Sequence, residues 1–535
     1  MKTFKRFSAI LLAVLMMVSM MVIPASADPA PTGSITINNT DEHHTFKIYQ
    51  IFTGTLQDKI LVNIAWGTGV NSTNLGEAKT QAGSLTNPAQ ALQFAQSLID
   101  GDYLVDAGDK SNWLTPGTGQ TSVSLSNLAV GYYLIVDTMT EHENAAISQY
   151  MVQVLGNVSM DPKSGNPSVV KLVSRDGKTY DHGISANIGD TVYYKSTISL
   201  HSEIKAYANY YVSLEDSMAA GLTYASLDTI TLYVENGSSK KQIVNTSSNT
   251  YYTAEIVEGK LVITIPDIHR AILAATGAPT AISDTIVVYY NATVNENIVV
   301  GSAGNTNTVT LEYSNNPNQN YDGVNFAGIS KGTATSDTAV VYTYRVNLKK
   351  VDSTDTSDPL AGATFVAYQK VEGSNEKTYL RFDKGNGNKF LGYTSLESEA
   401  TELTSNADGL IEVQGLGSGT YWFHETVAPA GYHTNETDVS VTFKGALDGN
   451  TGLLGSMTAS QSGGAGVVVG MEDKTVDGVT VKVPTGLITV TVTNSKGATL
   501  PTTGGIGTTI FYGIGGVLML GALSLLLVRK RSTAK

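Results

Sequence analysis

The chain has 535 residues, 53 of them glycine, and contains no cysteine. Its formal net charge of −13 argues against nucleic acid as a partner, because proteins that neutralise phosphates carry an excess of lysine and arginine. A chain without cysteine also has no disulfides, so covalent reinforcement outside the cell would have to use other chemistry.

The first segment, residues 1–27, is predicted to be a cleaved secretory signal peptide. A basic start, MKTFKRF, precedes an apolar stretch from Ala9 to Ile23 and an Ala-Ser-Ala exit that ends at Ala27. These are the three parts of a signal peptide. The apolar run of about 15 residues is shorter than the roughly 20 that span a bilayer. We therefore expect the chain to be secreted.

Most of the remaining chain is predicted to be β structure. Segments that alternate apolar and polar residues recur between Gly, Asn and Pro, as in SITINN, GYYLIVDT, LVITIP and GLITVTVTNS. A period of two is typical of half-buried strands, so we expect an all-β protein made of β-sandwich domains. Short helices are predicted at 87–100 and 267–276, each beginning with a suitable N-cap residue.

Two junctions divide the chain into three predicted domains. DPKSGNP at 161–167 is a Pro/Gly linker, and TAVVYTYRVNLKK at 338–350 runs from one set of strands into another. The expected domains are an N-terminal β domain at 28–165, a middle β-sandwich at 166–343 and a C-terminal β-sandwich at 344–498. The segments at 370–389 and 460–470 are interpreted as loops of the third domain.

The last predicted segment, 499–535, combines a pentapeptide, an apolar run and a basic tail. The pentapeptide is Leu500, Pro501, Thr502, Thr503 and Gly504. An uncharged run from Ile506 to Val528 follows, and the basic tail favours the cytoplasmic side of a membrane. The pentapeptide fits the sortase signal Leu-Pro-x-Thr-Gly, in which a cysteine transpeptidase attacks the carbonyl of Thr503 and passes the acyl group to an amine. A tail-anchored protein with a chance LPTTG is the alternative.

A lysine at the first junction is a candidate for that amine. Lys163 directly follows Pro162 in NVSMDPKSG, so we expect it to be exposed. The segment resembles the pilin motif of Gram-positive backbone pilins, a Val-x-Val-Tyr-Pro-Lys-like strand. Val158 and the Pro-Lys pair match, whereas the two residues before Pro162 do not. The order of all segments is similar to that of a three-domain, sortase-assembled major pilin.

The resemblance implies a structural polymer and no turnover enzyme. Thr503 of one subunit would be joined to Lys163 of the next, in a cell-surface pilus anchored to the cell wall. The implied partners are pilus-specific and housekeeping sortases, identical subunits, peptidoglycan, minor pilins and a host surface ligand, with no cofactor or metal. The alternative is a wall-anchored monomeric adhesin or a minor pilin.

Three segments of the third domain resemble a CnaB-type domain. VNLKKVDSTDTSDPLAGATF, YWFHETVAPAGYH and TVTNSKG are similar to its first strand, E-box and last strand. The resemblance implies an isopeptide bond between Lys350 and Asn494, assisted by Glu425. Lys350 fits the family pattern Lys-x-Asp better than Lys349, and strand alternation lets only one of them point inward. Burial would favour a neutral amine and a neutral acid, so that the amine attacks the amide and ammonia leaves.

The middle domain presents a parallel set of residues. NPSVVKLV supplies Lys171, YVSLEDSMAAGLTY supplies Asp216 in a pattern similar to the family's Asp-box, and GNTNTVTLEYSNNP supplies Asn307. The resemblance implies a second bond, between Lys171 and Asn307. Asn305 is the competing residue, but the sequence from Asn307 matches the family's closing strand better.

The first domain has a weaker candidate set. GYYLIVDT (131–138) parallels GTYWFHET (419–426), which favours a shared topology of the first and third domains. Lys47, Asp137 and Asn157 could form a similar trio. The segments around Lys47 and Asn157 match poorly, so no bond is predicted there.

Overall fold

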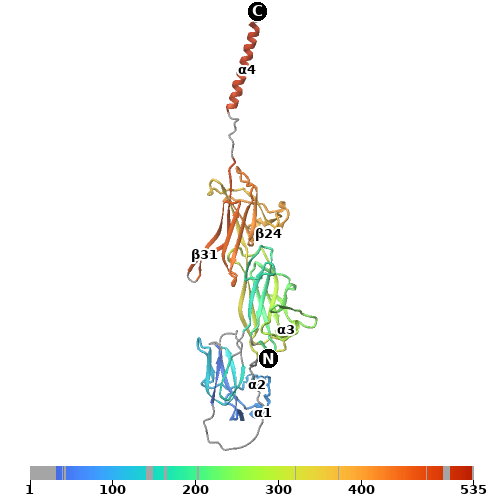
Figure 1. Cartoon of the computed structure of the whole chain (residues 1–535), viewed down its shortest axis with the longest axis vertical. Coiled ribbons are helices and arrows are strands. Elements are labelled where there is room, and N and C mark those ends of the chain that lie inside the picture. The colour runs from blue at the N-terminus through green and yellow to red at the C-terminus, as the bar shows by residue number, and fades with distance from the viewer. Residues whose placement is uncertain are drawn as a thin grey trace, which may run out of the picture.

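The computed structural model describes residues 32–38, 40, 44–139, 149–161, 166–201, 204–205, 207–317, 319, 321–371, 373–476, 479–497 and 506–532. The strands fall into three sets that share no sheet. These sets follow one another along an elongated molecule, with helix α4 at one end (Figure 1). The predicted signal peptide, Lys163 and the LPTTG pentapeptide lie outside the described residues.

The first set forms a 3-stranded sheet, β5-β1-β8, and a second sheet in the order β3-β2-β6-β7 with β4 paired to β2. The first and last strands of the set, β1 and β8, are parallel neighbours. The strands are β1 (Thr32–Asn38), β2 (His44–Gln57), β3 (Ile60–Trp66), β4 (Trp113–Leu114), β5 (Ser122–Ala129), β6 (Gly131–Met139), β7 (Gln149–Val154) and β8 (Asn157–Met160).

Both predicted helices are confirmed. In α2 (Pro88–Asp100), the Asn87 side chain accepts a hydrogen bond from Gln90 N at 3.0 Å. In α3 (Ile268–Thr276), Asp267 caps the start and Gly277, with φ of 73°, ends the helix in the left-handed conformation that glycine adopts without strain. A third short helix, α1 (Ala78–Ser84), was not predicted; neither its Glu77 cap nor its first turn carries a helix-start signal.

The middle set is a sandwich of two sheets, in the orders β10-β20-β19-β12-β17-β16 and β15-β14-β18-β11-β9, with β13 paired to β18. The strands are β9 (Ser168–Ser174), β10 (Gly183–Ser185), β11 (Thr191–Ser199), β12 (Val212–Met218), β13 (Leu222–Tyr224), β14 (Thr231–Asn236), β15 (Ser239–Ile243), β16 (Thr253–Val257), β17 (Lys260–Ile265), β18 (Thr285–Val294), β19 (Asn305–Ser314) and β20 (Lys331–Tyr342). β20 therefore closes the set, and β19, which carries Asn307, is the strand before it.

The third set is one 11-stranded sheet, in the order β29-β28-β27-β22-β23-β24-β26-β21-β31-β30 with β25 paired to β22. The strands are β21 (Tyr344–Asp352), β22 (Thr364–Lys370), β23 (Lys377–Asp383), β24 (Lys389–Thr394), β25 (Leu403–Thr404), β26 (Leu410–Leu416), β27 (Gly419–Val427), β28 (Val439–Leu447), β29 (Leu454–Ser462), β30 (Gly466–Val476) and β31 (Val479–Asn494). The interpretation of 370–389 and 460–470 as loops was wrong, because β23 and the start of β30 lie within them.

The middle and third sets share one continuous hydrophobic core, whereas the first set has two clusters of its own. Only Thr343 separates β20 from β21. Asn187 of the middle set is buried against the third set, where its Oδ1 accepts hydrogen bonds from Gly417 N at 2.7 Å and Tyr421 Oη at 3.0 Å. The two sets are therefore joined by packing as well as by the chain.

The C-terminal helix α4 (Ile506–Ser532) begins where the predicted apolar run begins. Its segment Thr509–Lys530 has 22 residues and a mean hydropathy of 2.2, and no part of it is buried in the rest of the protein. By length and composition this helix can cross a membrane.

Candidate functional site

The third set brings Lys350, Glu425 and Asn494 together. Lys350 is near the end of β21 and Asn494 ends β31, its parallel neighbour, where Asp352 pairs with Asn494 in register. Glu425 lies near the end of β27. All three side chains are buried, although each could form strong bonds with water. Such burial of polar groups is favourable only when they satisfy one another.

Contacts within this group join every pair. Lys350 Nζ donates to Asn494 Oδ1, and lies 3.0 Å from Glu425 Oε1. Asn494 Nδ2 donates to the two carboxylate oxygens of Glu425, at 3.0 and 3.2 Å. The acid therefore contacts both the amine and the amide nitrogen, which are the groups that lose and gain a proton in an amide exchange.

The surroundings of Lys350 favour its neutral form. Burial lowers the pKa of the Lys350 ammonium, and the Glu425 carboxylate acts in the opposite direction. Asn435 N donates to Glu425 Oε2 at 2.7 Å and fixes the carboxylate from its other side. A neutral amine is the form that can attack the amide carbonyl of Asn494.

The choice between Lys349 and Lys350 follows from strand alternation. Lys350 is 0% exposed, whereas Lys349 on the opposite face of β21 is exposed. Only Lys350 lies in the buried group.

The middle set brings Lys171, Asp216 and Asn307 together across its two sheets. Lys171 is on β9 in one sheet, and Asp216 and Asn307 are on β12 and β19 in the other. All three are buried. Lys171 Nζ contacts the Asp216 carboxylate. Burial lowers the pKa of the Lys171 ammonium, while Asp216 acts in the opposite direction.

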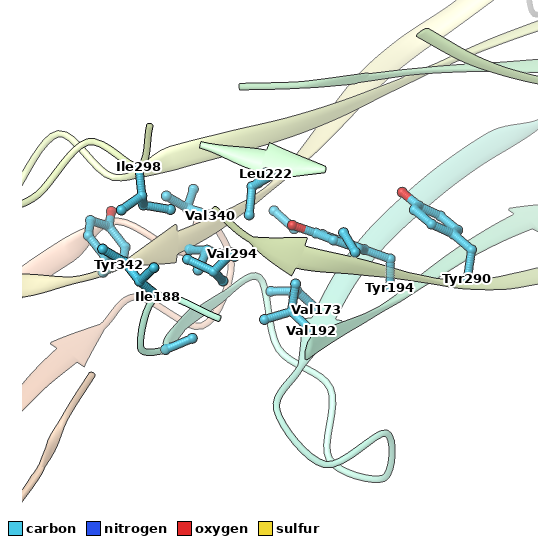
Figure 2. Packing of buried hydrophobic residues seen from close by; sticks show 14 of the residues in the cluster. Val173, Ile188, Val192, Tyr194, Leu222, Tyr290, Val294, Ile298, Val340 and Tyr342 are labelled. Atoms are coloured by element: carbon cyan, nitrogen blue, oxygen red, sulfur yellow. The ribbon is translucent and has the colours of Figure 1, made fainter. Parts of the chain in front are cut away.

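A residue that the sequence analysis did not single out lies among these three. Tyr290 of β18 accepts hydrogen bonds from Lys171 Nζ at 2.6 Å and from Asn307 Nδ2 at 2.9 Å, and donates to Asp216 Oδ2 at 2.6 Å. Its ring stacks on that of Tyr194, and Figure 2 shows the two rings beside the aliphatic core. The alternation of residues in TIVVYYNATV predicts that Tyr290 points inward. The neighbouring sequence, however, does not indicate which side chains its hydroxyl will bond to.

Asn305 has a different role from Asn307. Its Oδ1 accepts from Val299 N at 2.9 Å, and its Nδ2 donates to Val299 O at 2.8 Å and to Val341 O at 3.2 Å. These bonds hold the turn that precedes β19. Asn307 Oδ1, by contrast, has no hydrogen-bond partner among the residues that the structure describes.

The trio considered for the first domain is not brought together. Lys47 Nζ lies 3.5 Å from Asp106 Oδ2 and over the ring of Trp113. Asp137 is buried and contacts His44 Nδ1 at 3.0 Å. Lys47 pairs with Val136 in register, so its side chain lies on the opposite face of the sheet from Asp137. The first strand, β1, contains no lysine.

Possible metal ligands were sought among the described residues. No group of three or more His, Cys, Asp or Glu side chains there is arranged to hold a metal ion. Asp352, the last residue of β21, accepts a hydrogen bond from Tyr432 Oη at 2.8 Å and lies 2.9 Å from Lys496 Nζ.

Comparison with known families matches two parts of the chain. Residues 344–451, which hold β21 to β28, match the SpaA prealbumin-like fold domain. Residues 492–535 match the LPXTG cell wall anchor motif. The second match includes the predicted pentapeptide and helix α4.

A known protein and a solved structure are similar to the chain over most of its length. The trypsin-resistant surface T6 protein of Streptococcus pyogenes serotype M6 is 24% identical, over 94% of this chain and 95% of its own. The solved structure of the T6 backbone pilin of Streptococcus pyogenes, described as modular and three-domain, is 19% identical with a TM-score of 0.53; it covers 88% of this chain and 100% of its own. The structural likeness concerns the fold. The LPXTG anchor motif indicates a secreted surface protein that is anchored to the cell wall, and over most of its length the chain is similar to a Gram-positive backbone pilin.

Proposed function

We propose that this chain is the shaft subunit of a covalent cell-surface pilus. Sortase joins the carbonyl of Thr503 in one subunit to the amine of Lys163 in the next, and the completed fibre is attached to peptidoglycan. The subunit consists of the domains 28–165, 166–343 and 344–498, between a signal peptide at 1–27 and a sorting signal at 499–535. Its partners are the sortases, identical copies of the chain and minor pilins.

Two internal isopeptide bonds reinforce the subunit. Lys350 is joined to Asn494 with Glu425 as the assisting acid, and Lys171 is joined to Asn307 with Asp216 in that role. In each case the amine nitrogen bonds to the side-chain carbonyl carbon and ammonia leaves. The reaction occurs once per molecule, so the chain is a structural protein and a sortase substrate.

The observation that carries this proposal is the occurrence of two buried Lys–acid–Asn groups in a chain that ends in an LPXTG anchor. Burial of a lysine is costly unless it is paired or neutral. Both buried lysines contact an acid, and both asparagines lie within the same group. In a chain without cysteine, such bonds would supply the covalent reinforcement that disulfides give other proteins outside the cell.

The proposal is tested by whether the chain forms covalent polymers on the cell. Cells that express the chain with Lys163→Ala should lose the ladder of high-mass species on denaturing gels, because the acceptor amine is missing. The matched control is Lys178→Ala, which removes an exposed lysine on the turn after β9 and should leave the ladder intact.

Two results would contradict the proposal. An unchanged ladder in the Lys163→Ala strain would remove Lys163 from the acceptor role. A wild-type strain in which the chain is found in the wall only as single copies would favour the monomeric adhesin instead.

A further inference from the structure

The acids of the two buried groups reach their asparagines in different ways. In the third set, Glu425 contacts both Lys350 Nζ and Asn494 Nδ2 directly. In the middle set, Asp216 contacts Lys171 Nζ, but no hydrogen bond joins the described side chains of Asp216 and Asn307. Aspartate is one methylene shorter than glutamate. The shorter acid does not contact the nitrogen that has to leave.

The hydroxyl of Tyr290 occupies the gap between acid and amide. It lies 2.6 Å from Asp216 Oδ2 and 2.9 Å from Asn307 Nδ2. The same oxygen is 2.6 Å from Lys171 Nζ. It is therefore within proton-transfer distance of the acid, the nucleophile and the leaving group.

We propose that Tyr290 is a catalytic residue of the middle-domain reaction, which relays the proton of Asp216 to the departing nitrogen of Asn307. The inference rests on the proposed Lys171–Asn307 bond and assigns the route by which that bond forms. It also accounts for the use of an aspartate where the third domain uses a glutamate.

The relay conserves atoms and charge. Asp216 first takes a proton from the Lys171 ammonium, which leaves a neutral amine and a neutral acid. The hydrogen bond between Asp216 and Tyr290 then reverses, so that the acid donates to the hydroxyl and the hydroxyl donates to Asn307 Nδ2. Nζ bonds to the carbonyl carbon of Asn307 as the bond to Nδ2 breaks. Asp216, now a carboxylate, takes one proton from Nζ, and ammonia leaves.

The site keeps Tyr290 in the form that this relay needs. Its side chain is almost fully buried, and burial raises the pKa of its hydroxyl well above the ordinary value. The phenol therefore stays protonated at neutral pH. Stacking on Tyr194, with ring centroids 5.3 Å apart, holds the ring in place independently of the hydroxyl (Figure 2).

The test is Tyr290→Phe, which removes the hydroxyl and keeps the ring. Tyr289→Phe is the matched control, because Tyr289 precedes Tyr290 on β18, lies on the opposite face of the strand and donates its hydroxyl to Glu235 Oε1 at 3.0 Å. Intact mass and tryptic mapping of freshly purified protein, followed over time, report each bond separately. We expect Tyr290→Phe to slow formation of the Lys171–Asn307 bond by roughly 100-fold, as loss of a general acid does. The Lys350–Asn494 bond should form normally and shows that the chain has folded.

A second variant separates proton transfer from positioning. Tyr290→Phe combined with Asp216→Glu places a longer acid in the site, and we expect the bond to form again as it does through Glu425. Equal rates in Tyr290→Phe and Tyr289→Phe would overturn the inference, as would a double variant that stays unbonded. If tryptic mapping of the wild-type chain found no crosslinked peptide that contains Lys171 and Asn307, both the crosslink and the relay would be overturned. The loss of high-mass species in the Lys163→Ala strain tests polymerisation independently of this bond.

Discussion

Lys350 and Asn494 are 144 positions apart in the sequence, yet Lys350 Nζ donates a hydrogen bond to Asn494 Oδ1. Their strands, β21 and β31, are parallel neighbours. β31 leads towards the sorting signal, and β21 follows the middle set after Thr343 alone. A bond between these two side chains would pass tension from one end of the subunit into the middle set without unzipping the sheet of the third.

The first prediction concerns the acids. Glu425→Gln keeps the shape of the side chain but removes the proton that it transfers, and Asp216→Asn does the same in the middle set. Measured against its own calculated mass, each variant should show a deficit smaller than that of wild type by about 17 Da, the mass of the one ammonia that is no longer lost. Mass spectrometry of the purified soluble part, residues 28–498, measures this difference.

The matched control for Glu425→Gln is Glu412→Gln. Glu412 lies on β26 next to β21 and pairs at the surface with Arg345 at 3.5 Å. This variant should keep the wild-type mass loss. A Glu425→Gln chain with the wild-type mass loss would show that the bond forms without the acid.

The second prediction concerns stability. Closing a loop of 144 positions stabilises the folded chain by about 5 kcal/mol on the loop-entropy estimate. Lys350→Met removes the bond together with the buried amine, so its free energy of unfolding should fall by up to that amount. Glu425→Gln removes the bond but leaves a buried lysine without its carboxylate, which costs about 3 kcal/mol more. Guanidinium unfolding should therefore rank wild type, Lys350→Met and Glu425→Gln in falling order. The reverse order of the two variants would contradict this account.

The period of two in the sequence is a good predictor of the strands, because one face of each strand in a sandwich is buried. It also predicts that only one lysine of the Lys349–Lys350 pair points inward, whereas the preference for Lys350 came from the family pattern Lys-x-Asp. The helices at 88–100 and 268–276 were predictable because their capping residues are local signals.

Features that depend on contacts between distant strands could not be predicted in the same way. In the sequence, Tyr290 is one more inward-pointing residue of a predicted strand. Its contacts with Lys171, Asp216 and Asn307 arise only because β9, β12 and β19 lie around it in the fold. The segment around β23 was interpreted as a loop because it is rich in Gly, Asn and charged residues, which are typical of loops. It nevertheless contains a strand that pairs with β22 and β24. The face on which Lys47 lies is likewise set by its register with β6.

The third prediction is a pH dependence that appears only without the bond. In Asn494→Ala, Lys350 remains an amine beside Glu425. Burial lowers the pKa of this amine in the folded chain, whereas in the unfolded chain it returns to about 10.4. Between these two values the unfolded state binds more protons, so the free energy of unfolding rises with pH. In the bonded wild type the nitrogen is an amide and does not titrate.

The stability difference between wild type and Asn494→Ala should therefore narrow as the pH rises through the lowered pKa towards 10. Urea unfolding at a series of pH values measures it. The double variant Asn494→Ala with Lys350→Met lacks the amine, so its difference from wild type should stay constant. A constant difference for the single variant as well would mean that Lys350 titrates in the folded chain as it does when unfolded.

The fourth prediction concerns the contact between the middle and third sets. Asn187 Nδ2 donates to Tyr393 Oη at 2.9 Å, and Asn187 Oδ1 accepts from Gly417 N and Tyr421 Oη. Asn187→Ala leaves the buried N–H of Gly417 without this acceptor, at about 1–3 kcal/mol. The Tyr421 and Tyr393 hydroxyls keep other acceptors, Gly417 O at 2.9 Å and Gln369 Oε1 at 3.0 Å. Both internal bonds lie elsewhere and should still form. The variant should therefore weaken the coupling of the two sets without changing the mass.

Calorimetry of the soluble part measures this coupling. In wild type we expect the two sets, which share one core, to unfold in a single transition; in Asn187→Ala the transition should broaden or split. Asn236→Ala is the control, because its side chain bonds only to Ser283 and Asp284 among the described contacts, both within the middle set. That variant should lower the midpoint without splitting the transition. If Asn187→Ala unfolds in the same single transition as wild type, the shared apolar core alone couples the sets and the asparagine is dispensable.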